Sequence, residues 1–527
     1  MITRPGRSLR RVLTLAVAGL VAAAGCAVGP STRPPVAVRG ESMPPSPSAT
    51  EPPPPPPALP APDPMQPTID FDDCTAAVLR DLSVPIPPDR QLRVECGELA
   101  VPTDPQERGL GRGRVEVLRI SPEGASADRP PLLALGDTAV QPSALHALTI
   151  ATQVPRELLD SYTLVGLDRR GAGADALDCS SPSARAALLD ADPVDLSDAD
   201  LTRLLEDARA VVQDCYLLHS GGLSGYRTAS TAADVEQLRG ALGVARLSAV
   251  GVGDGATALA RWAAQFPQSV GRLVLDGPLD PVRDEPERSE ATAGAVEAAF
   301  DAFAVACTAP GGCPLGNEPR AAVLDLVDQL RDRPVAAVDG RRLTAGGAVT
   351  ALVTALSEPR DWPALAAALA AARAGDPAGM LALLSPVVGP DGRFDTTLAT
   401  ACNDSARRLA PAEVAELAAR WQAQYPIAGG RHALRLLACA PWPAGGGPAS
   451  AAPTAPAPPL LVIGVARDPR GPLDGARRVA DTIPTSVFVS WQGAGTGAYP
   501  RTPCISTAVD RMLIDGVLPA PGTLCPP

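Results

Sequence analysis

Apolar residues fall into short runs from about residue 70 onward, and helix-like segments such as 231–243 separate these runs. The first two runs alternate apolar and polar positions, which is typical of antiparallel strands with one solvated face. The later runs are almost continuously apolar, as expected of parallel strands covered by helices on both faces. We therefore predict an α/β protein with a mostly parallel, eight-stranded sheet. The predicted strands are residues 92–102, 113–121, 130–136, 162–168, 246–252, 271–277, 458–465 and 485–491.

The pattern becomes mostly helical and Ala- and Leu-rich between residues 281 and 457. Because a strand-like run follows this block, the helices are expected to form a cap inserted into the sheet domain. The predicted body then has three parts, which are a first core part at 70–280, the cap at 281–457 and a C-terminal core part at 458–527.

The first 25 residues have the features of an export signal. A basic start with four arginines precedes an apolar stretch, Val12 to Ala24, that is too short for a stable membrane anchor. The stretch ends in small residues before Cys26, which resembles a bacterial lipobox. We expect cleavage here, a lipid on Cys26 and a location on the outer face of the cell membrane. Residues 26–69 are rich in Pro and Ser and are predicted to form a disordered tether.

The chain has 11 cysteines, an odd number for an exported protein, and a lipidated Cys26 would leave ten for disulfides. Neighbours in sequence make plausible pairs, although the sequence alone does not settle the connectivity. No C-x-x-C pair is present and only three histidines occur, so no zinc site is expected. The plausible pairs are Cys74–Cys96, Cys179–Cys215, Cys307–Cys313, Cys402–Cys439 and Cys504–Cys525.

The net charge of −12 and a pI near 4.9 argue against a nucleic-acid partner. The sequence contains no lysine, and all 46 basic residues are arginines. A P-loop lysine and a Ser–Lys dyad are therefore excluded, and no cofactor is expected.

The stretch "AVGVGDGATA" at 249–258 lies between a predicted strand and a predicted helix, and two interpretations fit it. Gly251, Gly253 and Ala256 have the spacing of a dinucleotide-binding loop, with Asp276 as the ribose acid. However, that loop usually opens its domain, and here it follows the fifth strand. The alternative is a nucleophile elbow, G-x-S-x-G, whose central position is occupied by Gly253.

Several segments around this stretch resemble one family. "GRLVLDGPLDP", "YTLVGLDRRGAG", "ECGELAVPTD", "CAPWP" and "VLPAPGTLC" are similar to segments of actinobacterial secreted tripeptidyl aminopeptidases and related proline-iminopeptidase-like serine hydrolases. The resemblance covers about residues 70 to 527 and implies an α/β-hydrolase fold. It also implies the sequential disulfide pairs given above.

The resemblance places a Ser–Asp–His triad on three positions of this chain. The nucleophile falls on Gly253, the acid on Asp468 in "RDPRGP", and the base on Thr496 in "GAGTG". Asp137, in the altered oxyanion loop "LGDTAVQPS", and Asp254 would both lie near the site of a developing oxyanion, where a carboxylate opposes catalysis. Only Asp468 of the triad would therefore be retained.

We therefore expect a non-catalytic pseudo-hydrolase of the cell envelope that binds a peptide, an amine or an envelope ligand. The binding expectation rests on an acidic floor that Asp137, Asp254 and Asp468 would give the cleft. Two alternatives remain, which are a peptidase or esterase with a non-standard site and a purely structural envelope lipoprotein. A large, concave pocket would favour binding, whereas a filled one would favour the structural role.

Overall fold

The computed structural model describes residues 69–81, 86–87, 90–126, 128–389, 392–443 and 458–527. These residues all belong to one compact unit, Met65–Pro527. Cys26, the export signal and almost all of the expected tether lie outside the described ranges. Among the described helices, none combines the length and the apolar character that crossing a bilayer requires.

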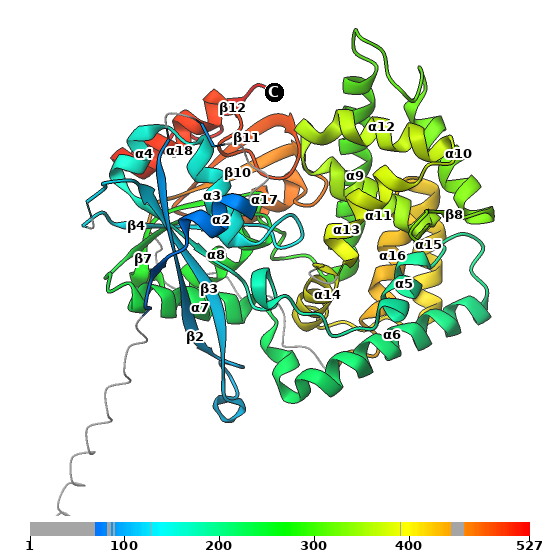
Figure 1. Cartoon of the computed structure of the whole chain (residues 1–527), viewed down its shortest axis with the longest axis horizontal. Helices are drawn as coiled ribbons and strands as arrows, with labels where there is room; N and C mark the ends of the chain where they lie inside the picture. The colour runs from blue at the N-terminus through cyan, green and yellow to red at the C-terminus, as the bar shows by residue number, and fades with distance from the viewer. Residues whose placement is uncertain (1–68, 82–85, 88–89, 127, 390–391, 444–457) are drawn as a thin grey trace, which may run out of the picture. The chain divides into compact units, whose positions relative to one another are not determined.

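A ten-stranded sheet forms the centre of the body (Figure 1). All eight predicted strands are present in it, and two strands of two residues each, which the sequence pattern did not predict, extend its edges. Strands this short carry no readable periodicity. The strands are β1 (Asp72–Asp73), β2 (Leu92–Pro102), β3 (Arg112–Pro122), β4 (Pro131–Leu135), β5 (Thr163–Leu167), β6 (Leu247–Val252), β7 (Val270–Asp276), β10 (Leu460–Arg467), β11 (Ser486–Ala494) and β12 (Leu524–Cys525).

The strand order is β1-β2-β3-β5-β4-β6-β7-β10-β11-β12. The pairs β1–β2, β2–β3 and β3–β5 are antiparallel, and every later pair is parallel. This agrees with the alternating pattern of the first two predicted strands and the continuous apolar runs of the others. The parallel strands end at one edge of the sheet, where their carboxyl ends meet.

Helices cover both faces of the sheet because alternate residues of the central strands point to opposite sides. In β4, Leu132 and Ala134 belong to one apolar core, and Leu133 and Leu135 belong to the other. The first core includes α3, α4 and α18, and the second includes α7, α8 and α17. The helices of the sheet domain are α2 (Thr75–Asp81), α3 (Ser143–Gln153), α4 (Arg156–Ser161), α7 (Thr228–Ala241), α8 (Asp254–Gln265), α17 (Leu473–Thr482) and α18 (Pro503–Asp515).

The remaining helices form a cap with apolar clusters of its own (Figure 1). Its first two helices correct the expected division, because residues 182–219 were assigned to the core and instead pack with the cap. Leu201 and Leu204 share an apolar cluster with Trp421 and Leu437. The cap helices are α5 (Pro182–Asp190), α6 (Asp198–His219), α9 (Glu285–Cys307), α10 (Pro319–Asp332), α11 (Ala345–Leu356), α12 (Trp362–Arg373), α13 (Ala378–Val388), α14 (Phe394–Asp404), α15 (Pro411–Gln424) and α16 (Gly429–Ala438), with a small hairpin of β8 (Val335–Ala336) and β9 (Arg342–Leu343).

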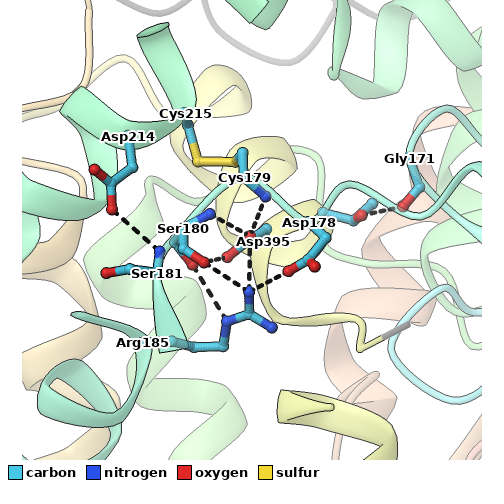
Figure 2. The surroundings of a disulfide bond; sticks show 10 residues. Gly171, Asp178, Cys179, Ser180, Ser181, Arg185, Asp214, Cys215 and Asp395 are labelled. Carbon is cyan, nitrogen blue, oxygen red and sulfur yellow. Dashed lines mark hydrogen bonds and ion pairs between the residues drawn. A yellow bond between two sulfur atoms is a disulfide. The ribbon is translucent and has the colours of Figure 1, made fainter. Parts of the chain in front are cut away.

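Five disulfides connect the expected sequential neighbours. Figure 2 shows how one of them, Cys179–Cys215, lies beside a buried polar cluster that joins the segment before α5 to α14. Asp395 accepts hydrogen bonds from the backbone N–H groups of Cys179 and Ser180, both at 2.8 Å. Arg185, which is also buried, lies 3.4 Å from the same carboxylate oxygen. The cluster thus fixes this part of the cap through one fully hydrogen-bonded acid.

Candidate active site

The turn between β6 and α8 has the geometry of a nucleophile elbow. Gly253 follows the last residue of β6 and immediately precedes α8, with φ 57° and ψ −120°. A positive φ with this ψ is a strained conformation that glycine adopts at little cost. The Gly253 N–H donates to the carbonyl of Asp276 at the end of β7, 2.8 Å away, which holds the turn against the sheet. The residue at the apex therefore has elbow geometry and no hydroxyl group.

The space in front of Gly253 is occupied by the side chain of Asp137. An ideal Cβ built on Gly253 would lie 2.1 Å from Asp137 Oδ2, 2.8 Å from its Cγ and 2.9 Å from its Cβ. Real Cβ atoms essentially never approach other atoms closer than 3.0 Å. Asp137 follows β4 and is 3% exposed, so it fills a closed position. No side chain fits at position 253 unless this carboxylate moves.

The chain's own carboxylates also occupy the backbone donors that would form an oxyanion hole. In an elbow of this type, these donors are the N–H after the nucleophile and one from the loop after the third strand. Here the Asp254 N–H lies 3.4 Å from Asp137 Oδ2, and the Thr138 N–H donates to Asp254 Oδ1 at 2.9 Å. Both donors therefore face fixed negative charge, which opposes the charge that acyl transfer develops.

Two arginines neutralise these carboxylates, and neither was singled out from the sequence. Arg169, 4% exposed, forms an ion pair of 2.5 Å with Asp254. Arg470 Nε lies 3.2 Å from both oxygens of Asp137. Burial raises the pKa of Asp254, and Arg169 opposes that rise while Asp137 adds to it. Ion pairs with arginines therefore neutralise two of the three acids that were expected to form an acidic floor, and Asp468 is the third.

Asp468 and Thr496 meet as an acid and its partner would. Thr496 Oγ1 donates to Asp468 Oδ1 at 2.9 Å, and both residues are buried. Burial raises the pKa of Asp468 to about 6, although hydrogen bonds from the Arg470 and Gly471 backbone and from Thr496 partly lower it. The Thr496 hydroxyl contacts the acid but has no basic nitrogen, so it cannot accept a proton near neutral pH.

The loop around Thr496 lies next to the elbow. A Cβ on Gly497 would fall 2.8 Å from Val252 Cγ1, directly before the apex residue. Arg470 joins Asp468 to Asp137, because its backbone N–H donates to Asp468 Oδ1 at 2.9 Å and its Nε lies 3.2 Å from both oxygens of Asp137. The fold therefore brings together all of the residues that the sequence singled out for this site, namely Gly253, Asp468, Thr496, Asp137 and Asp254.

None of the three histidines stands at the position of Thr496. His146 of α3 is half-buried, and burial lowers its pKa to about 4. Its Nδ1 contacts Gln141, and its buried Nε2 has no hydrogen-bond partner among the described residues. His432 of α16 is buried, with a pKa lowered to about 3 by burial and by neighbouring arginines. His219 lies at the end of α6, in the cap.

The geometry also removes the dinucleotide interpretation of this turn. Asp276, the expected ribose acid, is fully buried and accepts hydrogen bonds from the backbone N–H groups of Ala498 and Tyr499 at 2.7 and 2.9 Å. Burial raises its pKa to about 7. An acid held inside the protein in this way is not available to a ribose hydroxyl.

A cavity of about 680 Å³ opens beside the elbow, between the sheet domain and the cap. Asp254, Thr257 and Arg261 of α8 line one part of it, and His432 and Arg435 of α16 line another. This volume lies within the range of roughly 300–1,000 Å³ that is usual for small-molecule pockets. The site therefore retains a concave space even though the nucleophile position is filled.

The strand order, the helical cap and the strained turn after the fifth long strand define an α/β-hydrolase. Residues 425–525 match the family described as "TAP-like protein". Over 462 residues the chain is 28% identical to serine protease Hip1 of Mycobacterium tuberculosis H37Rv, covering 82% of this chain and 87% of that protein. The chain is therefore similar to the tripeptidyl aminopeptidase-like hydrolases that the sequence motifs predicted, and its C-terminal part matches the TAP-like family.

Two further relatives are named for different enzymatic activities. Carboxylesterase B of Mycobacterium tuberculosis H37Rv is 28% identical over 455 residues, covering 82% of this chain and 86% of that protein. A tripeptidyl aminopeptidase of Streptomyces coelicolor is 30% identical over 221 residues, which are 41% of this chain and 39% of that protein. The relatives are hydrolases, and their names do not agree on a substrate.

Proposed function

We propose that this chain is a non-catalytic binding protein of the cell envelope, built on a serine-hydrolase scaffold without a nucleophile or a base. In this proposal it is exported and held on the outer face of the cell membrane by a lipid on Cys26. The export and lipid steps rest on the basic, apolar and small-residue pattern before Cys26.

The Asp137 carboxylate in front of Gly253 is the observation that carries the proposal. It lies 2.1 Å from where the first side-chain atom of a nucleophile would be attached, and it contacts the donor that would stabilise an oxyanion. Losing a single oxyanion donor costs about 10²–10³-fold in rate, and losing the nucleophile or base of a triad costs on the order of 10⁶-fold. A hydrolase with all of these changes would have no measurable triad chemistry.

The alternatives receive less support. A non-standard hydrolase would need a base, and the described histidines are either held neutral by burial or placed in the cap. Asp254 would be a poor nucleophile because Arg169 and the Thr138 N–H bind its two oxygens. A purely structural role does not account for an open cavity of about 680 Å³ beside the elbow.

The test is a search for hydrolysis by the purified chain with its disulfides intact. Aryl esters, tripeptide anilides and a fluorophosphonate probe are incubated with native and heat-inactivated protein. We expect no turnover and no labelling above the inactivated control. Turnover that copurifies with the folded chain, or labelling of a residue in the cavity, would overturn the proposal.

Two designed variants make this negative result informative. Gly253→Ser with Thr496→His restores both lost groups and should remain unlabelled, because Asp137 still fills the space. Adding Asp137→Gly clears that space, and the triple variant should react with the fluorophosphonate. If the double variant reacts as well as the triple variant, Asp137 is not the obstruction.

A further inference from the structure

The cavity beside the elbow is lined by more basic than acidic groups. Seven arginines and one histidine line it, against four carboxylates. Each of these acids already has a partner. Three form ion pairs, which are Asp254 with Arg169, Asp280 with Arg478 and Glu285 with Arg288. Asp404 instead accepts hydrogen bonds from the hydroxyl and the N–H of Thr228. Three of the four acids are therefore neutralised by arginines, and Asp404 keeps its charge and acts on Arg261.

Five of the seven arginines pair with acids. Arg288 and Arg478 pair with the cavity acids named above, and the other three pair with acids outside the lining. Arg227 lies 2.5 Å from Asp104, Arg407 lies 3.1 Å from Asp284, and Arg470 lies 3.2 Å from Asp137. The remaining two are Arg261 and Arg435.

Arg261 and Arg435 form no ion pair with any described residue. Arg261, on α8, has a buried Nε that finds no hydrogen-bond partner in the described part of the chain. Arg435, on α16, is exposed and lines the cavity. Arg470 uses Nε to bind Asp137, so its two Nη groups are left without a described partner. Arg261 and Arg435 together carry ten side-chain N–H donors, because each guanidinium group has five.

Arg435, Arg470 and His432 line the same cavity. The surrounding protein and the positive charge of Arg470 lower the pKa of Arg435, while Glu285 opposes this. Burial lowers the pKa of His432, and Arg435, Arg431 and Arg470 add to that effect. Cations that repel one another are stabilised when an anion binds between them.

The walls between these groups include apolar side chains. Leu279, Val353, Leu398 and Leu436 contribute to the lining. A cavity with apolar walls and a few polar groups that converge is the usual form of a site for an organic molecule. The body of such a ligand would pack on the apolar walls, while its charged end would bind the arginines.

We propose that the cavity binds organic anions, with a carboxylate or phosphate held by Arg435 and Arg470 and an apolar body against the leucine and valine walls. The inference rests on the proposed binding function, and it favours an anion over the amine that was one of the ligands expected from the sequence. Arginine suits this role because its planar fork matches carboxylate and phosphate oxygens. Neutral His432 adds one hydrogen-bond donor beside the anion.

The test compares probes that share one apolar body and differ in charge. Isothermal titration with the full chain uses 4-phenylbutyrate, 4-phenylbutyl phosphate, 4-phenylbutanol and 4-phenylbutylamine at pH 7.4. Both anions should bind at least tenfold more tightly than the alcohol, and the amine should not bind. Raising the salt concentration should weaken the anions and leave the alcohol unchanged.

Variants locate the site. Arg435→Gln and Arg470→Gln should each weaken 4-phenylbutyrate at least tenfold, and Arg435→Gln leaves the pair between Arg470 and Asp137 intact. Arg341→Gln is the matched control because its exposed pair with Asp339 lies outside the cavity lining. The chain has three histidines, and only the side-chain nitrogen resonances of His432, which lines the cavity, should shift with 4-phenylbutyrate, while those of His146 and His219 stay fixed.

Each outcome decides the inference. Equal binding of all four probes, preferred binding of the amine, or no binding of either anion overturns it, as does an unchanged affinity in Arg435→Gln. The hydrolysis assay on the same samples separates it from the proposed function. If the chain binds the anions and also hydrolyses esters, the anion site is supported and the proposed non-catalytic function is overturned. If the chain is inactive and binds no anion, the non-catalytic function is supported and the anion site is overturned.

Discussion

Replacing Gly253 by alanine tests whether the Asp137 carboxylate has taken the place of a nucleophile. Two costs are expected. The first is backbone strain, since a non-glycine residue in such a conformation costs roughly 1–3 kcal/mol. The second arises because the new Cβ would lie 2.1 Å from Asp137 Oδ2, so the carboxylate must leave its position.

The second cost is set by the partners that Asp137 would lose. Its oxygens accept from Ala139 N–H at 2.9 Å and lie 3.2 Å from Arg470 Nε. Asp137 is 3% exposed, and breaking a buried ion pair costs about 3–5 kcal/mol. We therefore expect Gly253→Ala to lower the free energy of unfolding by at least about 4 kcal/mol, a large part of a typical domain's stability.

A double-mutant cycle separates the two costs. In an Asp137→Gly background no carboxylate has to move, so adding Gly253→Ala should cost only the strain of roughly 1–3 kcal/mol. The coupling free energy between the two sites should then be about 3 kcal/mol. Urea unfolding of the oxidised chain, followed by circular dichroism and tryptophan fluorescence, measures all four proteins.

Gly243 offers a matched control for the strain alone. It has a positive φ of 70°, and a Cβ built on it meets nothing within 4 Å. Gly243→Ala should cost about 1–2 kcal/mol and show no coupling to Asp137→Gly. If Gly253→Ala and Asp137→Gly are additive to within about 0.5 kcal/mol, the reasoning about the filled nucleophile position is refuted.

Two further predictions concern buried carboxylates. Burial raises the pKa of Asp468 from 3.8 to about 6, so the folded state binds the proton of this carboxyl more tightly than the unfolded state does. The ionised carboxylate therefore lowers the free energy of unfolding, and this penalty grows as pH rises from 3.8 and is complete above about 6. Asp468→Asn removes that penalty, and its unfolding free energy relative to the native chain should increase by about 2 kcal/mol between pH 4.5 and pH 7.5; a constant difference across this range would contradict the assignment. Asp395→Ala leaves the buried Arg185 without this carboxylate and should lower the unfolding free energy by about 3 kcal/mol, whereas Asp339→Ala, at an exposed ion pair, should change it by less than about 1 kcal/mol.

The strands and the elbow could be predicted because each leaves a signal in a short stretch of sequence, whereas the disulfide pairs followed from the family resemblance. Apolar periodicity marked the eight long strands, and the glycines around residue 253 marked the turn. The positions of Asp468 and Thr496 followed from family motifs, and the hydrogen bond between them agrees with those positions. The assignment of residues 182–219 failed because an amphipathic helix does not reveal which domain covers its apolar face.

The charge of the cleft could not be predicted, because it depends on contacts between distant segments. Asp137 and Arg470 are 333 positions apart in the chain, and Arg169 reaches Asp254 from another strand end. The sequence placed three acids near one site and contained no signal for the arginines that neutralise them. Arg435 was missed for the same reason, since an arginine in a cap helix is usually a solvated surface residue.

The positions of Gly253 and Asp137 depend on each other. The Asp137 carboxylate cannot occupy its present position while residue 253 has a Cβ, because the two would lie 2.1 Å apart. With glycine there, the carboxylate gains the positive end of α8 at Asp254 N–H and the charge of Arg470. A working oxyanion hole must instead keep these donors free for the transition state, at a cost in stability. If the proposed function is correct, glycine at position 253 is therefore a condition for the inward placement of Asp137, and the ion pair with Arg470 stabilises a site that does not have to keep its donors free.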